Sequence, residues 1–166
     1  DAGKVESIRR MTNRGRFVVS SAVLASSKAQ HSATVSLRNG VNLQIGGRLS
    51  GVVETPGFST GRRADHEFRG AVTIQAPRRY NRVRLDFEAL DLETSSQCST
   101  DIVLIRESGS TVRTMCSDVL PKPYLSVSRE VTIVFLTDKM KSSRGFRFRF
   151  TATNDADLCS STMQFQ

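Results

Sequence analysis

Two stretches of alternating residues decide the fold class: Val83-Arg84-Leu85-Asp86-Phe87 and Phe146-Arg147-Phe148-Arg149-Phe150. Apolar and charged residues alternate in both, so each presents one face to a core and the other to water, with the period of a β-strand. Two fuller apolar runs, Ile102–Ile105 and Val131–Phe135, are rich in β-branched residues and predict buried central strands. Turn residues rather than helical patterns separate these runs. The sequence therefore predicts an all-β fold, an antiparallel sandwich.

The length of 166 residues is that of one ordinary domain. There are 24 Lys and Arg against 16 Asp and Glu, a net charge of +8 that favours anionic partners. No block of five or six like charges occurs, so no nucleic-acid tail is predicted. No apolar run approaches the roughly 18 residues that cross a bilayer, so no membrane span is predicted.

Residues 1–44 form a distinct basic segment, with seven bases and two acids giving a net charge of +5. Asn39-Gly40 lies between two apolar arms in Ala33–Ile45 and predicts an extra β-hairpin. A three-residue loop over residues 38–40 joins apolar to apolar and is preferred to a two-residue loop. That register pairs Leu37 with Val41 and Val35 with Leu43.

Catalytic groups are hard to assemble from this sequence. The histidines are His31, in a polar stretch, and His66, among charges, and both are expected to be solvated loop residues. No G-x-S-x-G, P-loop or GxGxxG pattern occurs. We therefore expect that the chain is not an enzyme.

Three acids lie beside predicted strands. Glu93 follows the strand of residues 83–90, Asp101 precedes Ile102–Ile105, and Asp138 ends the strand that begins at Val131. Three carboxylates that converged at one end of a sandwich would repel one another unless a cation lay between them. Oxygen ligands in irregular loops suit calcium better than zinc.

Three cysteines occur and none forms a C-x-x-C pair, so a structural zinc site is not expected. Cys98 and Cys116 are 18 residues apart, a comfortable spacing for one disulfide. Cys159 is then left over as a free thiol, or as the partner of another chain or of a missing segment.

From Ile45 to about Asn154 the chain resembles a CUB domain, an extracellular β-sandwich module. The resemblance rests on an ordered series of motifs rather than on one of them. The motifs, in chain order, are Gly46–Gly51, Thr55–Phe58, Val72–Pro77, Val83–Phe87, Leu90–Glu93, Cys98–Asp101, Cys116, Val131–Phe135, Thr137-Asp138 and Gly145-Phe146.

The resemblance implies a jelly-roll-like sandwich over residues 45–155, preceded by the extension 1–44 and followed by a tail, 156–166, with the unpaired Cys159. It implies a Cys98–Cys116 disulfide, and hence an oxidising compartment and secretion from the cell. The family's other disulfide is missing, because its cysteines align with Ile45 and Gly70. The Asn39-Gly40 hairpin is a candidate to tether this edge instead.

The resemblance also implies that Glu93, Asp101 and Asp138 bind calcium. It further implies that the loops around this ion bind a basic side chain of a partner protein. One substitution opposes this. A tyrosine that supports the family site is replaced by Arg62, and an arginine there can pair with the carboxylates in place of calcium. Lys139 and Lys141 add positive charge nearby.

Two further functions stay open. The first is assembly: the segment 1–44 pairs with the sheet edge of a neighbouring subunit, and Cys159 links the subunits of a homo- or hetero-oligomer. The alternative to assembly is that the segment folds back on its own domain. In the second, a basic stripe binds a sulfated glycan. Its candidate residues are Arg78, Arg79, Arg82, Arg84, Arg147 and Arg149.

Overall fold

The structure is a computed structural model that describes residues 33–140 and 143–156. No helix within these residues is long and apolar enough to span a membrane. The elements, in chain order, are β1 (Thr34–Ser36), β2 (Asn42–Gly46), β3 (Ser50–Glu54), the 3-10 helix η2 (Phe58–Thr60), β4 (Arg69–Gln75), β5 (Arg82–Asp91), β6 (Ile102–Glu107), β7 (Ser110–Met115), β8 (Tyr124–Leu125), β9 (Glu130–Leu136) and β10 (Gly145–Thr153).

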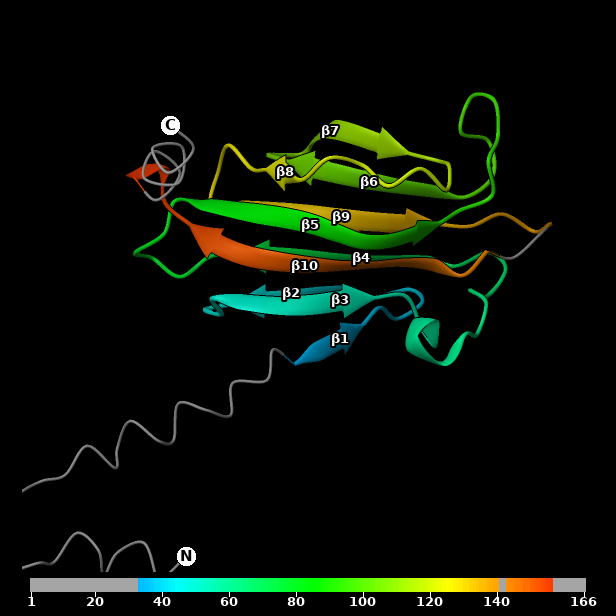
Figure 1. Cartoon of the computed structure of the whole chain (residues 1–166), viewed down its shortest axis with the longest axis horizontal. Coiled ribbons are helices and arrows are strands. Elements are labelled where there is room, and N and C mark those ends of the chain that lie inside the picture. The colour runs from blue at the N-terminus through cyan, green and yellow to red at the C-terminus, as the bar shows by residue number, and fades with distance from the viewer. Residues whose placement is uncertain (1–32, 141–142, 157–166) are drawn as a thin grey trace, which may run out of the picture. The chain divides into compact units, whose positions relative to one another are not determined.

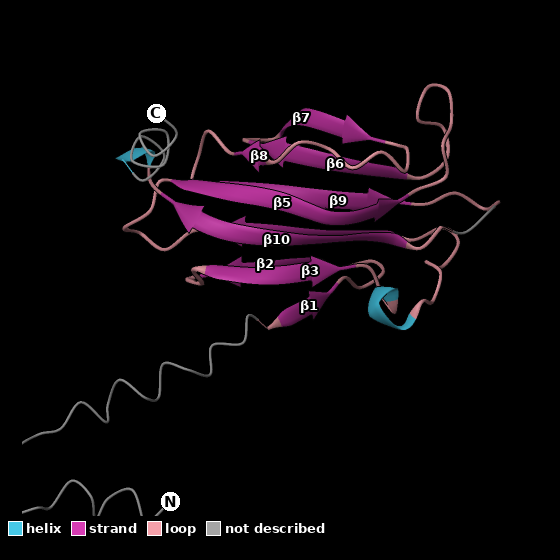
Figure 2. Ribbon diagram, in the orientation of Figure 1, coloured by secondary structure: helices cyan, strands magenta, loops and turns pink. Residues whose placement is uncertain are grey.

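The strands form two five-stranded sheets that face each other (Figures 1 and 2). Sheet A has the strand order β1-β3-β10-β5-β8, and sheet B has the order β2-β4-β9-β6-β7. The β1–β3 and β2–β4 pairs are parallel, whereas the other pairs are antiparallel. The predicted all-β sandwich is confirmed, with mixed rather than purely antiparallel sheets.

The alternating stretches lie at the centre of sheet A. Val83, Leu85 and Phe87 of β5 are buried, and so are the three phenylalanines of β10, Phe146, Phe148 and Phe150. The ring of Phe148 lies 5.4 Å from that of Phe87 across the β5–β10 pair. The Phe146 ring meets Phe135 of β9 at 5.4 Å and 89°, an edge-to-face contact that joins the two sheets. The period of two therefore defines the core, as predicted.

The predicted N-terminal hairpin is wrong. The turn is present, because the Val41 amide donates to the Arg38 carbonyl and Gly40 has a φ of 74°. However, its arms enter different sheets: β1 pairs with β3 in sheet A, and β2 pairs with β4 in sheet B. Leu37, just before the turn, is 1% exposed and packs in the core between the sheets. Burying Leu37 there requires the arms to separate.

The turn nevertheless tethers the edge of sheet B. The Gly40 amide donates to the Arg69 carbonyl at 2.7 Å, and the Arg69 amide donates to Asn39 Oδ1 at 2.9 Å. The expected domain boundary, between residues 44 and 45, falls inside β2. Residues 34–46 are thus built into the sandwich.

Candidate functional site

Three loops meet at the right-hand end of the sandwich in Figure 1. They follow β3, β5 and β9 and comprise residues 55–68, 92–101 and 137–144. The Ala64 amide donates to the Ser143 carbonyl at 2.7 Å, and the Glu67 amide donates to the Asp138 carbonyl at 2.9 Å. These hydrogen bonds hold the first and third loops together. We call this region the acidic end, because the three candidate metal ligands lie on it.

Glu93 and Asp101 are brought together within the second loop. Asp101 is fully buried, and its Oδ2 lies 3.5 Å from the Glu93 amide nitrogen. The Thr100 hydroxyl donates to the Glu93 carbonyl at 3.2 Å, which closes the loop between the two acids. Glu93 Oε2 and Asp101 Oδ1 are buried without a hydrogen-bond donor. Buried polar atoms in native structures nearly always have a partner, so these two oxygens are the candidates for binding a ligand.

Ser143 links this pair to the third loop, and its role was not predicted. Its side chain is 5% exposed, and its hydroxyl donates to Asp101 Oδ2. Because its carbonyl accepts from Ala64, Ser143 connects all three loops of the acidic end. The sequence around it, Lys141-Ser142-Ser143-Arg144, has no spacing that distinguishes this serine from its neighbour.

Asp138 lies on the third loop without joining a three-acid cluster. Its Oδ1 accepts from the Met140 amide at 2.9 Å, a local turn contact. Within residues 33–140 and 143–156, no three His, Cys, Asp or Glu side chains are grouped closely enough to hold a metal ion. The structure therefore unites two of the three predicted ligands, and a shared ion for all three stays a prediction.

Two of the basic residues expected to oppose calcium, Arg62 and Lys139, pair with other acids, while Lys141 lies outside the described residues. Arg62 Nη2 lies 3.1 Å from Asp65 Oδ1, and Lys139 Nζ lies 3.4 Å from Glu67 Oε1. Both pairs are exposed. Arg62 therefore does not satisfy the orphan oxygens of Glu93 and Asp101.

A disulfide joins Cys98 to Cys116, as predicted, with 5.2 Å between the Cα atoms. It ties the loop of Glu93 and Asp101 to the residue that follows β7. The loop has little regular structure, and Gln97 and Cys98 both adopt positive φ values. A cross-link lowers the conformational freedom that the two acids would otherwise have.

The predicted basic stripe lies on the outer face of sheet A, where β5 and β10 adjoin. Four of the six predicted arginines, Arg82, Arg84, Arg147 and Arg149, are paired there with acids of the same sheet or of the C-terminal segment. The other two, Arg78 and Arg79, follow β4 of sheet B and form no ion pair with a described residue. Arg147 contacts Glu54 and Glu88, Arg149 contacts Glu88, Arg84 contacts Asp86, and Arg82 contacts Asp155. This face is therefore an alternating ion-pair ladder rather than a purely cationic stripe.

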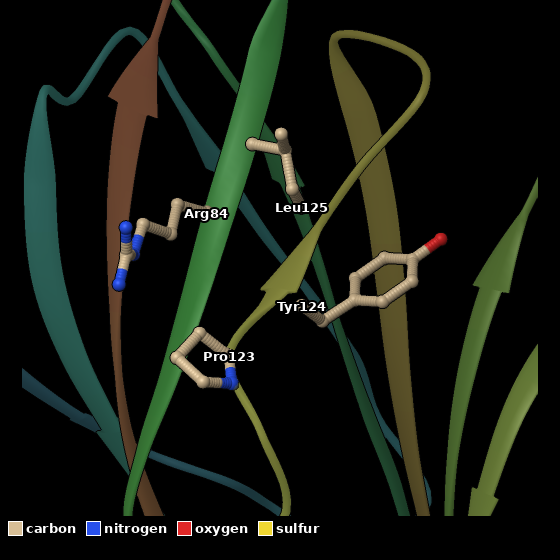
Figure 3. Close-up of a pocket in the computed structure, with 4 residues that line it drawn as sticks. All are labelled: Arg84, Pro123, Tyr124 and Leu125. Atoms are coloured by element: carbon tan, nitrogen blue, oxygen red, sulfur yellow. The ribbon is translucent and has the colours of Figure 1, made fainter. Parts of the chain in front are cut away.

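A small pocket of about 120 Å³ lies where β8 meets β5, lined by Arg84, Pro123, Tyr124 and Leu125. Figure 3 shows the Arg84 guanidinium and the Tyr124 hydroxyl pointing to opposite sides. A ligand pocket normally has several convergent polar groups. This one offers a single cation and is not a strong ligand site.

The other residues that could carry chemistry are exposed or lie outside the described residues. His66 is exposed, as expected. His31, Cys159 and residues 1–32 lie outside the described residues, so the assembly hypothesis that rests on them stays a prediction.

Comparison with known sequences identifies a family. The family model of the CUB domain matches residues 49–150. Mouse ovochymase-2 is 33% identical over 88 residues, pig cubilin 29% over 107, and mouse tolloid-like protein 2 30% over 112. These alignments cover 51%, 62% and 65% of this chain but 14%, 3% and 11% of the relatives. The chain thus spans a small part of the length of these relatives.

Solved structures share the fold. The MASP-1 CUB2 domain bound to Ca2+ matches with a TM-score of 0.60 and 21% identity, covering 69% of this chain and all of that one. The full extracellular region of zebrafish Gpr126/Adgrg6 matches with a TM-score of 0.61 and 19% identity, covering 68% of this chain and 15% of that one. The family model spans more than half of the chain, and the sheets described above agree with it: the chain belongs to the CUB domain family.

Proposed function

We propose that this chain is a non-catalytic, extracellular protein-interaction module that binds calcium at its acidic end and there holds a basic side chain of a partner protein. The observation that carries the proposal is the pair of buried oxygens, Glu93 Oε2 and Asp101 Oδ1, that lack a donor. The disulfide supports an oxidising compartment. A structure with the same fold, the MASP-1 CUB2 domain, was determined bound to Ca2+.

The donor set fits calcium. Carboxylate oxygens and loop carbonyls are the ligands that calcium prefers, and calcium tolerates the irregular geometry of loops. Glu93 and Asp101 belong to one loop, Asp101 is fully buried, and a bound calcium would supply positive charge to both carboxylates. Glu93 and Asp101 would hold the ion, while Ser143 orients Asp101 by donating to its other oxygen. Asp138 is the third ligand that the sequence predicts.

The same end suits a basic partner. Seven acids lie on or beside its three loops: Glu54, Asp65, Glu67, Asp91, Glu93, Asp101 and Asp138. Glu54, Asp65 and Glu67 already form ion pairs, whereas none of the ion pairs among the described residues includes the other four. A lysine or arginine of the partner would meet carboxylates whose orientation is already fixed by the protein. Charge-assisted hydrogen bonds of this kind are about twice as strong as neutral ones.

The proposal is tested by thermal unfolding of the whole chain in calcium and in EDTA. A ligand at 100 times its dissociation constant stabilises by about 2.7 kcal/mol, and for a domain of this size that raises the midpoint by several degrees. Asp101→Asn keeps the shape of the side chain and removes its charge, so the calcium shift should disappear in this variant. Glu130→Gln removes an exposed acid at the start of β9, at the opposite end of the sandwich, and should shift like the wild type. An unchanged wild-type midpoint in millimolar calcium would refute the calcium site.

A further inference from the structure

A second charged surface lies at the opposite end of the sandwich, on the left in Figure 1. Three neighbouring strands of sheet B reach it: β2 and β4 end there, and β9 begins there. Their terminal residues lie in one row, because Gly46 pairs with Gln75 and Gln75 pairs with Glu130. The segments beyond this row are therefore side by side, about 5 Å apart from strand to strand.

Each of these segments carries arginine. Arg48 follows β2, Arg78 and Arg79 follow β4, and Arg129 precedes β9. The Ala76 amide donates to the Arg129 carbonyl at 2.9 Å, which joins two of the segments directly. Arg48, Arg78 and Arg79 are exposed and Arg129 is half-buried. We call these four residues the arginine end.

The arginine end differs from the arginines of sheet A in its pairing. None of the ion pairs among the described residues includes Arg48, Arg78, Arg79 or Arg129. Arg79 lies over the Tyr80 ring at 5.2 Å from the centroid, a contact that leaves its charge uncompensated.

The acids of this region are few and partly engaged. Asp155 pairs with Arg82 Nε at 2.5 Å and accepts from the side-chain Nδ2 of Asn81 at 3.0 Å. Glu130 lies in the row itself, and its carboxylate accepts from Gln75 at 3.4 Å. Glu107 at the end of β6 is a third acid, and it accepts from the amides of Val127 and Ser128. The four arginines of the arginine end, together with Arg82, therefore outnumber the three carboxylates Glu107, Glu130 and Asp155.

We propose that the arginine end binds a linear sulfated glycan. The four guanidiniums come from three strands that span about 10 Å, close to the Debye length at physiological salt, so their potentials add. Guanidinium groups bind tetrahedral oxyanions through two parallel hydrogen bonds. Because Arg48, Arg78 and Arg79 are exposed and follow two different strands, they suit an extended chain that lies across these segments.

A sulfated glycan fits this surface better than a nucleic acid. Proteins that bind single strands place several aromatic rings along the groove as stacking platforms. The aromatic side chain here is Tyr80, already covered by Arg79. The Cys98–Cys116 disulfide also indicates an oxidising compartment, where nucleic acid is scarce. The site lies at the end opposite the acidic end and is independent of the calcium proposal.

Elution of the full chain from immobilised heparin tests this inference. The wild type should elute well above about 0.15 M salt, where long-range effects of net charge are screened. Arg78→Ala/Arg79→Ala should elute at clearly lower salt, and its slope of log Kd against log salt should fall by roughly one for each lost contact. Arg48→Ala/Arg129→Ala should behave alike, which would show that the segments act together.

A matched control removes the same charge elsewhere. Arg84→Ala/Arg149→Ala deletes two arginines of sheet A that pair with Asp86 and Glu88, and it should elute near the wild type. The inference is overturned if the wild type fails to bind heparin or if Arg78→Ala/Arg79→Ala elutes with the wild type. It is also overturned if Arg84→Ala/Arg149→Ala lowers the elution salt as much as Arg78→Ala/Arg79→Ala does. Self-association of the wild type that these arginines support, without heparin binding, would assign the surface to a second copy instead.

Discussion

At Gly145 the chain turns into β10 with a φ of 92°, in the left-handed region. A Cβ atom at this position would overlap Thr55 Oγ1 and lie 2.7 Å from Thr55 Cγ2. Thr55 is fully buried; its hydroxyl donates to the Arg144 carbonyl at 2.9 Å and accepts from the Phe146 amide at 3.3 Å. Glycine therefore allows the start of β10 to lie against the end of β3, and this contact fixes the loop that carries Ser143.

Gly145→Ala should destabilise the fold more than a positive φ alone explains. Gly61 is the matched control, because its φ is 75° and a Cβ there meets nothing within 4 Å. Gly61→Ala should lose about 1–2 kcal/mol for the left-handed backbone. Gly145→Ala should lose a further 1–3 kcal/mol for overpacking against Thr55. Urea unfolding midpoints measure both losses, and equal losses would show that Thr55 moves aside freely.

The candidate site could be predicted only in part at the residue scale. Glu93 and Asp101 stand out in the sequence because each adjoins an alternating or apolar strand, and strand ends are brought to one edge of a sandwich. Ser143 has no such marker, since its contact with Asp101 spans 42 positions. The position of Asp138 relative to them depends on the path of the loop after β9, which the pattern of the strand does not determine.

At the scale of elements, the two-residue strand β8 is held by one buried carboxylate of β6. Glu107 is 8% exposed and accepts hydrogen bonds from the Tyr124 hydroxyl, the Val127 amide, and the amide and hydroxyl of Ser128. Burial raises the pKa of Glu107, but these hydrogen bonds outweigh burial and hold the pKa below its ordinary value of 4.5. Burial and Glu107 together raise the pKa of Tyr124 to about 12. The ionised carboxylate of Glu107 thus holds β8 in place, although β8 forms few backbone hydrogen bonds of its own.

Glu107→Gln should reveal this role through its pH dependence. An amide would turn a donor toward the backbone N–H groups of residues 127 and 128, so the variant should lose about 2–3 kcal/mol at neutral pH. Because the folded pKa of Glu107 is depressed, its contribution is complete above about pH 4.5 and is lost as the pH falls through the folded value. The gap between wild type and variant should therefore close in acid.

Denaturant unfolding at several pH values between about 7 and 3 measures that gap. Glu130→Gln removes an exposed carboxylate of β9 and should show little loss at any of them. A constant gap for Glu107→Gln would mean that the carboxylate charge contributes nothing and that the loss is steric.

The segment around Asn39-Gly40 shows what a period of two can and cannot predict. Alternation correctly indicates that Val35, Leu37, Leu43 and Ile45 face inward, because the period fixes which face of a strand is apolar. It carries no information about the partner strand. The predicted hairpin pairs Leu37 with Val41, whereas in the structure Leu37 is buried and Val41 is 41% exposed. The arms instead pair with the edges of β3 and β4, which the local pattern does not reveal.

At the scale of the whole molecule, residues 34–46 connect the two sheets at their open edge. The Leu37 amide extends the pairing with β3 by donating to the Glu54 carbonyl at 2.9 Å, while Gly40 and Val41 bond to β4. Leu37 itself lies in the core between these attachments. The resemblance implies that the family's first disulfide would join the positions of Ile45 and Gly70, and we propose that the segment bonded to both sheets takes over its tethering role.

Leu37→Ala should therefore destabilise both sheets together. Truncating a leucine that is 1% exposed leaves a cavity and costs about 2–5 kcal/mol. Val41→Ala, four residues away and 41% exposed, should cost less than about 1 kcal/mol. Amide hydrogen exchange then distinguishes a joint from a local effect. If the segment joins the sheets, amides of β10 in sheet A and β9 in sheet B should lose protection by the same free energy in Leu37→Ala. Loss confined to β1 and β2 would show instead that the sandwich is stable without this connection.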